Sequence, residues 1–124
     1  MDYDIVISGG GIAGLTAAAA FASAGFTILC VDPAPPVTER EAAGADLRTT
    51  AFLQPAQLFL EETGLWPRLA EHAMPLEVMR IVDAGGERPE PRVIKDFESS
   101  DLSDKPFGWN LPNWLLRREM SARL

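Results

Sequence analysis

The sequence of 124 residues predicts an α/β fold with two parallel strands, a crossover helix between them and a small β-hairpin further along the chain. Three observations predict this fold. The stretch 5–31 carries no charged residue and has a β-branched segment at each end, as buried parallel strands do. A glycine run followed by an alanine-rich stretch lies between these segments. The segment 77–83 alternates roughly with a period of two and is followed by Gly85 and Gly86, which favours a hairpin.

The first unit is predicted as a strand over 4–8, a helix from Ile12 to about Ala24, and a second strand over 27–31 that ends at Asp32. The strand and the helix are joined by the sequence Gly9-Gly10-Gly11-Ile12-Ala13-Gly14, which fits the pattern G-x-G-x-x-G. This pattern indicates a dinucleotide-binding site when a strand precedes it, a helix follows it and an acid ends the next strand, as is predicted here. The chain is therefore predicted to have a Rossmann-like FAD/NAD(P)-binding fold with an incomplete parallel sheet.

Each part of the glycine pattern has a physical role in holding a diphosphate. Gly9 allows the tight turn, Gly11 lets a phosphate approach the backbone, and Gly14 lets the helix pack closely on the sheet. The first amides of the helix, at Ile12 and Ala13, have no partner inside it, and the helix dipole is positive there. An anionic diphosphate satisfies both.

Asp32 is expected to accept hydrogen bonds from ribose hydroxyls and to repel a 2′-phosphate, which disfavours NADP as the ligand. By length alone, 5–31 could instead be a membrane span. The adjacent glycines and Gly25 argue against one continuous helix, and no basic flank or cleavage site indicates a signal peptide. We therefore expect no transmembrane segment.

The remaining elements are predicted from the positions of proline and glycine and from the hydrophobic periodicity. Pro55 and Gly64 bound a predicted helix, with an earlier start near Thr50 as the alternative, and Leu65 is expected to pack back on Leu60. The other predicted elements are a loop over 33–46, a helical piece over 66–73, strands at 77–83, 92–95 and 109–111, and a helix from Trp114 with Asn113 as its N-cap.

Composition narrows the class of protein. The net charge of −7, with no basic cluster beyond Arg117-Arg118, argues against nucleic acid and against anionic membrane surfaces. The single Cys30 allows no disulfide or zinc pattern, so no metal site is expected. His72 is the only histidine and has no partner placed for a triad, so it is expected at the surface. The expected location is the cytoplasm.

Later segments resemble one family of flavoproteins. The stretch 47–53, the leucines at 58 and 60, and Glu62-Thr63-Gly64-Leu65-Trp66 resemble the second conserved stretch of the FAD-dependent aromatic hydroxylases. The ending Gly-Leu-Trp is most similar to the ubiquinone-biosynthesis hydroxylases (the UbiH/UbiF/VisC group), and 79–83 and 116–124 also resemble that group. The resemblance spans nearly the whole chain, although the family is much longer.

The resemblance implies FAD as the cofactor and assigns three contacts to it. Asp32 takes the acidic ribose position, which is usually a glutamate in the family. Arg48 falls on an arginine that lies near the flavin and the diphosphate. Arg117 falls on a further cofactor contact, and an alignment shifted by one residue would make Arg118 that contact. From the residues alone, Arg48 could be an ordinary surface cation, and Arg117 and Arg118 could complement the dipole of the last helix.

The activity that the resemblance implies is hydroxylation. NAD(P)H reduces FAD, and the reduced flavin uses oxygen to hydroxylate a small aromatic substrate, a phenol with or without a polyprenyl tail. No residue in 1–124 is nominated as catalytic. The Asp-Gly and Gly-Asp dipeptides of the family are absent, so we expect 1–124 to be the N-terminal part of an FAD-binding domain, without the substrate domain.

Further expectations follow for such a part of a domain. It should bind FAD weakly and show no turnover, and its exposed sheet should favour a homo-oligomer. The longer parent protein could be membrane-peripheral. Two other functions stay open: an NAD-dependent Rossmann oxidoreductase domain, and a non-catalytic interaction module. The region from Arg48 to Trp66 separates the first of these from the hydroxylases, because a simple Rossmann enzyme usually has another β–α unit there.

Overall fold

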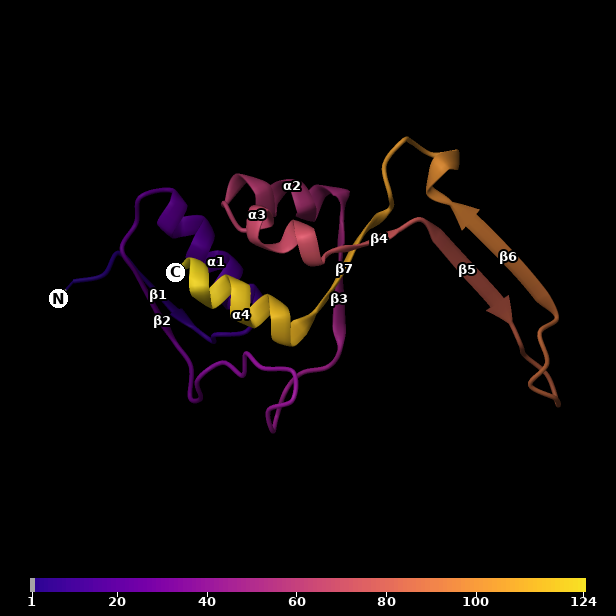
Figure 1. Ribbon diagram of the computed structural model, residues 1–124, viewed down its shortest axis with the longest axis horizontal. Coiled ribbons are helices and arrows are strands. Elements are labelled where there is room, and N and C mark those ends of the chain that lie inside the picture. The colour runs from indigo at the N-terminus through magenta and orange to yellow at the C-terminus, as the bar shows by residue number, and fades with distance from the viewer. Residues whose placement is uncertain (1) are drawn as a thin grey trace.

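The computed structural model describes residues 2–124, and Figure 1 shows the arrangement of their helices and strands. In chain order the elements are β1 (Ile5–Ser8), α1 (Ile12–Ser23), β2 (Ile28–Val31), β3 (Thr49–Leu53), α2 (Gln54–Glu62), α3 (Trp66–Leu69), η1 (Ala70–His72), β4 (Met74–Leu76), β5 (Val78–Asp83), β6 (Val93–Glu98), η2 (Ser99–Asp101), β7 (Gly108–Pro112) and α4 (Asn113–Arg123). The predicted α/β class is confirmed, and most predicted elements lie within two or three residues of their expected bounds.

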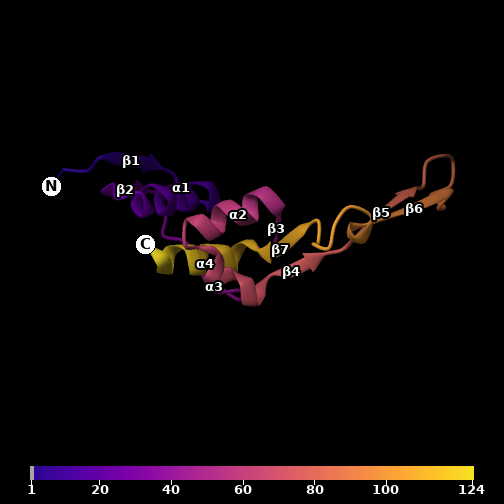
Figure 2. The same cartoon turned by 90° about the horizontal axis from the view of Figure 1, so that it is seen from above.

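The first unit is the predicted β–α–β crossover. β1 and β2 pair in parallel with Ile5 opposite Ile28 and Ser8 opposite Val31. The ladder continues past β1, because the Gly9 amide donates to the Val31 carbonyl over 2.7 Å. α1 packs on this strand pair, and α4 packs on α1 (Figure 2). The carboxyl ends of both strands therefore meet at the start of α1.

The turn from β1 into α1 is tightly packed at one glycine and open at another. Gly9 has a φ of +113°, which L side chains rarely adopt. A Cβ atom at Gly14 would clash with the Gly9 carbonyl oxygen, since the first turn of α1 lies directly against the end of β1. A Cβ at Gly11, in contrast, would meet no atom within 4 Å. The absence of a side chain at Gly14 thus lets α1 pack against the end of β1, while Gly11 borders open space.

A second sheet has the strand order β3-β7-β4 and is antiparallel throughout. Thr50 lies opposite Leu111, and Pro75 lies opposite Trp109. The alternative helix start near Thr50 is therefore wrong: 49–53 pair with a strand more than fifty residues later, which local sequence does not reveal. The sequence also missed β4, because a strand of three residues with a central proline has no periodicity of its own.

The core lies between α1, the α2–α3 corner, β7 and α4. Its buried members are Leu15, Ala19, Leu60, Leu65, Leu69, Leu111, Leu115, Leu116 and Met120. The predicted stop of α2 is confirmed: the Leu65 amide donates to the Leu60 carbonyl over 2.9 Å, and Gly64 has a φ of +74°. This corner turns the chain back so that Leu60 and Leu65 enter the same core.

The predicted hairpin is confirmed as β5 and β6, which project away from the rest of the molecule (Figure 1). Its residues are exposed on both faces. Arg80 and Asp96 face each other across the strands and form a bidentate ion pair with N···O distances of 2.7 and 2.8 Å.

The outer face of the β1–β2 pair is also open, and Val6 is 62% exposed there. Parallel strands are usually covered on both faces, so this face is an apolar surface without a covering layer among residues 2–124. Within the same range, the helices are too short or too polar for any of them to cross a bilayer.

We expect Gly14→Ala to lower the free energy of unfolding by about 2 kcal/mol or more, because its Cβ displaces backbone rather than a flexible side chain. The matched variant Gly11→Ala should lower it by no more than about 1 kcal/mol, the scale of a change at an N-cap. Urea unfolding followed by circular dichroism measures both. Equal losses in the two variants would contradict this account of the turn.

Candidate functional site: a cavity at the N-terminus of α1

A cavity of about 230 Å³ opens at the N-terminus of α1. Three segments that are distant in sequence line it: the glycine turn, the loop after β2, and α4. The lining residues are Gly10, Gly11, Asp32, Ala34, Pro35, Pro36, Val37 and Arg117. The open space beside Gly11 belongs to this cavity, so a ligand can approach the backbone at the point that the glycine pattern predicts.

Asp32 is fixed in the cavity by two backbone amides. Its Oδ2 accepts the Gly10 amide over 2.7 Å, and its Oδ1 accepts the Ala34 amide over 3.0 Å. These bonds, that of Ala34 first, hold the pKa of the Asp32 carboxyl below its usual value, and the positive charge of Arg117 adds to the effect. The group is therefore an anchored carboxylate, and each of its oxygens keeps a lone pair for a ribose hydroxyl.

The two adjacent arginines of α4 have different surroundings. Arg117 lines the cavity, and its Nε is buried without a hydrogen-bond partner among residues 2–124. Arg118 pairs with Glu119 over 2.9 Å and lies over the Trp114 ring at 5.2 Å. A buried N–H without a partner is costly, and an anionic ligand would satisfy it. The geometry favours Arg117 over Arg118, and its role as a cofactor contact stays a prediction.

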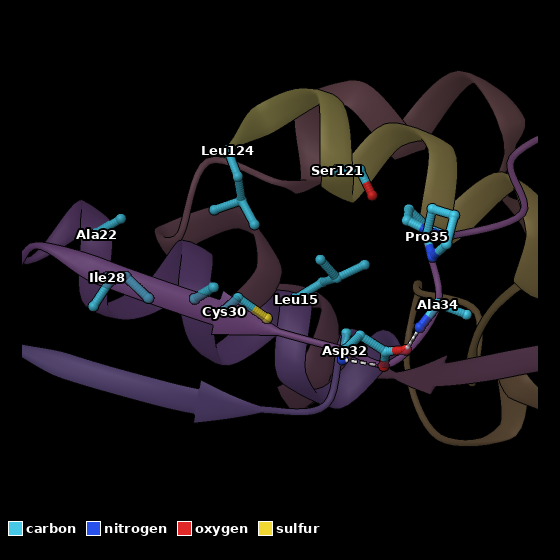
Figure 3. A pocket seen from close by; sticks show the side chains of 12 residues that line it. Leu15, Ala22, Ile28, Cys30, Asp32, Ala34, Pro35, Ser121 and Leu124 are labelled. Atoms are coloured by element: carbon cyan, nitrogen blue, oxygen red, sulfur yellow. Dashed lines mark hydrogen bonds between the residues drawn. The ribbon is translucent and has the colours of Figure 1, made fainter. Parts of the chain in front are cut away.

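Figure 3 shows a larger cavity of about 610 Å³. It shares Asp32 with the first cavity. Ile28 and Cys30 line it from β2, while Ser121 and Leu124 line it from α4 and the end of the chain. The Ser121 hydroxyl is buried and has no partner among residues 2–124. Apolar walls with few polar groups suit an adenine and its ribose. Sequence reasoning missed Ser121, because a serine near the end of a helix carries no signal of its own.

Arg48 lines neither of these cavities. Its side chain is 83% exposed and forms a bidentate ion pair with Asp46 at 2.9 Å. The contact to the flavin and the diphosphate that the resemblance assigns to Arg48 stays a prediction.

The prediction of Asn113 as the N-cap of α4 is wrong. Pro112 occupies that position, and Asn113 is the first residue of the helix. The Asn113 side chain is buried and bonds instead to Asp46 and Thr50, which lie more than sixty residues earlier. This role depends on tertiary contacts and could not be read from the local pattern.

The cysteine and the histidine have no place in the arrangement around Asp32 and Arg117. Cys30 is half-buried, with its sulfur 3.6 Å from the Gly9 carbonyl oxygen. His72 is partly exposed and lies 3.5 Å from Glu71. Over residues 2–124, no three His, Cys, Asp or Glu side chains are grouped so that they could hold a metal ion.

Comparisons with known proteins agree with this geometry. Residues 4–54 match a family model described as an FAD binding domain. The chain is 32% identical over 121 residues to ubiquinone hydroxylase UbiL of Rhodospirillum rubrum. The aligned region covers 98% of this chain and 27% of UbiL. The chain is therefore similar to an FAD binding domain over residues 4–54 and to a ubiquinone hydroxylase over nearly all of its length. The predicted resemblance to the FAD-dependent hydroxylases is confirmed, and so is FAD as the cofactor that the family model indicates.

Solved structures of flavoproteins have the same fold. The p-nitrophenol 4-monooxygenase PnpA from Pseudomonas putida has a TM-score of 0.67 at 17% identity, over 95% of this chain and 28% of its own. The flavin-dependent monooxygenase PieE, in complex with FAD and substrate, has a TM-score of 0.66 at 24% identity, over 98% of this chain and 22% of its own. The chain thus spans about a quarter of the length of the proteins it matches.

We expect Arg117→Gln to weaken binding of ADP, which carries the diphosphate and the adenosine, by about tenfold, the scale of one charge-assisted hydrogen bond. The matched variant Arg118→Gln should change it by less than about twofold, because Arg118 points to Glu119 and Trp114. Calorimetric titration at low and high salt measures both. A larger loss in Arg118→Gln would favour the alignment shifted by one residue.

Proposed function

We propose that the chain forms the dinucleotide-binding part of an FAD-dependent hydroxylase that acts on a phenolic substrate with NAD(P)H and oxygen. The observation that carries the proposal is the cavity at the start of α1, in which Gly11, Asp32 and Arg117 surround an open space. The identity to ubiquinone hydroxylase UbiL supports a phenolic substrate of the ubiquinone-biosynthesis type, with or without a polyprenyl tail.

The residues present fit an FAD molecule at its nucleotide end. Gly11 leaves its backbone accessible, and the amides at the start of α1 offer donors to the diphosphate. Asp32 would hold the ribose hydroxyls, and Arg117 would satisfy its buried Nε on a phosphate oxygen. Once bound, FAD would supply the redox chemistry, because it can pass electrons from a nicotinamide to oxygen.

In this proposal residues 1–124 bind and orient the cofactor but carry out no turnover by themselves. Among residues 2–124, Asp32 is the only acid that lines this cavity, and its hydrogen bonds from two backbone amides keep its pKa below the usual value. An ionised carboxylate held in this way is suited to a ribose and not to proton transfer. Binding of FAD should also be weak, because the contacts described here reach only the nucleotide part of the molecule.

Titration with FAD, ADP, NAD⁺ and NADP⁺ tests the proposal. We expect FAD and ADP to raise the melting temperature, since a ligand of the folded state stabilises it by mass action. NADP⁺ should raise it least, because its 2′-phosphate would lie near the Asp32 carboxylate. Flavin fluorescence gives the FAD affinity, and we expect the dissociation constant to lie above the low micromolar range.

The Gly11→Ala variant is the control for this titration, because its methyl group enters the open space without meeting other atoms of the protein. It should fold and lose most of the response to FAD. Tighter binding of NAD⁺ than of FAD would contradict the proposal and favour an NAD-dependent oxidoreductase. A chain that retains stoichiometric flavin through gel filtration would contradict the weak binding.

We also propose that the open face of β1 and β2 makes the chain self-associate. Val6 is 62% exposed on this face, and Val31 at the end of β2 is 43% exposed. Sedimentation velocity at rising concentration should show a dimer or larger species, and Val6→Lys should shift the distribution toward monomer. A monomer at all concentrations would contradict the expectation.

A further inference from the structure

Two buried side-chain polar atoms have no hydrogen-bond partner among residues 2–124, and both belong to α4. They are the Nε of Arg117 and the hydroxyl of Ser121. Because these residues are four apart in one helix, they lie on the same face of it, about 6 Å apart along its axis. A buried polar atom without a partner costs free energy of folding. Two such atoms on one face of α4 therefore indicate a surface that a ligand completes.

The two atoms belong to cavities that are continuous with each other. Arg117 lines the smaller cavity, and Ser121 lines the larger one. Figure 3 shows the Ser121 side chain pointing from α4 into the larger cavity. The residues common to both linings are Gly10, Asp32, Ala34, Pro35 and Pro36. A ligand can therefore extend from one cavity into the other along the Asp32 carboxylate.

The order of these polar groups matches the order of the groups in the nucleotide end of FAD. In the proposed function, Arg117 takes a phosphate oxygen and Asp32 takes the ribose hydroxyls. The base is attached to that ribose, and the larger cavity is the space that continues from Asp32 away from the phosphate position. Ser121 is therefore placed where a base would enter.

The chemistry of the larger cavity suits the polar edge of an adenine. Leu15, Ile28 and Leu124 give it apolar walls, against which a flat ring can pack. Among the side chains of residues 2–124 that line it, the Ser121 hydroxyl is the buried polar group without a partner. A hydroxyl both donates and accepts, and adenine presents an amino donor beside a ring-nitrogen acceptor. A buried group of this kind discriminates against any ligand that leaves it unpaired.

We propose that Ser121 is a specificity-determining residue that binds the polar edge of the adenine base. This inference rests on the proposed function, since it requires the ribose of such a ligand at Asp32. The Ser121 hydroxyl lowers the stability of the ligand-free chain and contributes to affinity only when a base is present. A hydroxyl that served to hold α4 in place would raise the stability of the ligand-free chain and would have no dependence on the base.

The variant Ser121→Ala tests this role through two measurements with opposite signs. In urea unfolding without ligand, its midpoint should not fall below that of the unchanged chain, because the substitution removes a buried group without a partner. In calorimetric titration it should weaken binding of FAD and of ADP by about fivefold, the scale of one hydrogen bond. Binding of ribose 5-diphosphate, which has no base, should change by less than about twofold.

Ser100→Ala is the matched control, because it removes a hydroxyl from an exposed serine of η2 that lines neither cavity. It should leave the binding of all three ligands unchanged.

Three outcomes would overturn the inference. A lower unfolding midpoint of Ser121→Ala, or an equal loss for ADP and ribose 5-diphosphate, would assign the hydroxyl a structural role. Unchanged binding of ADP by Ser121→Ala would show that the base does not reach it. Binding of neither FAD nor ADP by the unchanged chain would refute the proposed function and the inference with it, and this result is distinct because no variant is needed to obtain it.

Discussion

The contact between the Gly14 position and the Gly9 carbonyl is the constraint on which the rest of the site depends. With no side chain at Gly14, α1 begins directly against the end of β1. This approach fixes the direction of α1 over the β1–β2 pair, and it points the first helical amides at the space beside Gly11. A displaced helix would move both its first amides and the surface on which α4 packs, because both belong to α1.

α4 is the second rigid part of the site, and it is held at both ends. Leu116 and Met120 are fully buried in the core that α1 shares, while Asn113 ties the start of the helix to 46–50. Between these two attachments Arg117 has little freedom to move away from the cavity. The cavity therefore owes its shape to contacts among the glycine turn, the loop after β2 and α4, and not to any one segment.

The parts predicted correctly from the sequence are those with local causes. The β1–α1–β2 unit follows from hydrophobic runs, glycine spacing and an acid at a fixed distance, and the stop of α2 follows from Gly64 and Leu65. The errors share a different cause. β3 and β4 exist because both pair with β7, and Asn113 bonds to residues far earlier in the chain. Arg117 was the residue expected from the sequence, with Arg118 as the alternative, and only the packing of α4 shows that Arg117 is the one that lines the cavity.

The charges at the site explain how a chain with a net charge of −7 can offer a place to a diphosphate. The strongest local donors are backbone amides at the start of α1, which add no net charge and need no counterion. Arg117, the arginine that lines the cavity, has an acid nearby in Asp32. Such pairing weakens the long-range attraction for anions in general and leaves the short-range donors in place. Under the proposed function, binding would then depend on whether a ligand fits its phosphates to the amides and its ribose to Asp32. An adenine dinucleotide meets both conditions, whereas an inorganic anion meets only the first.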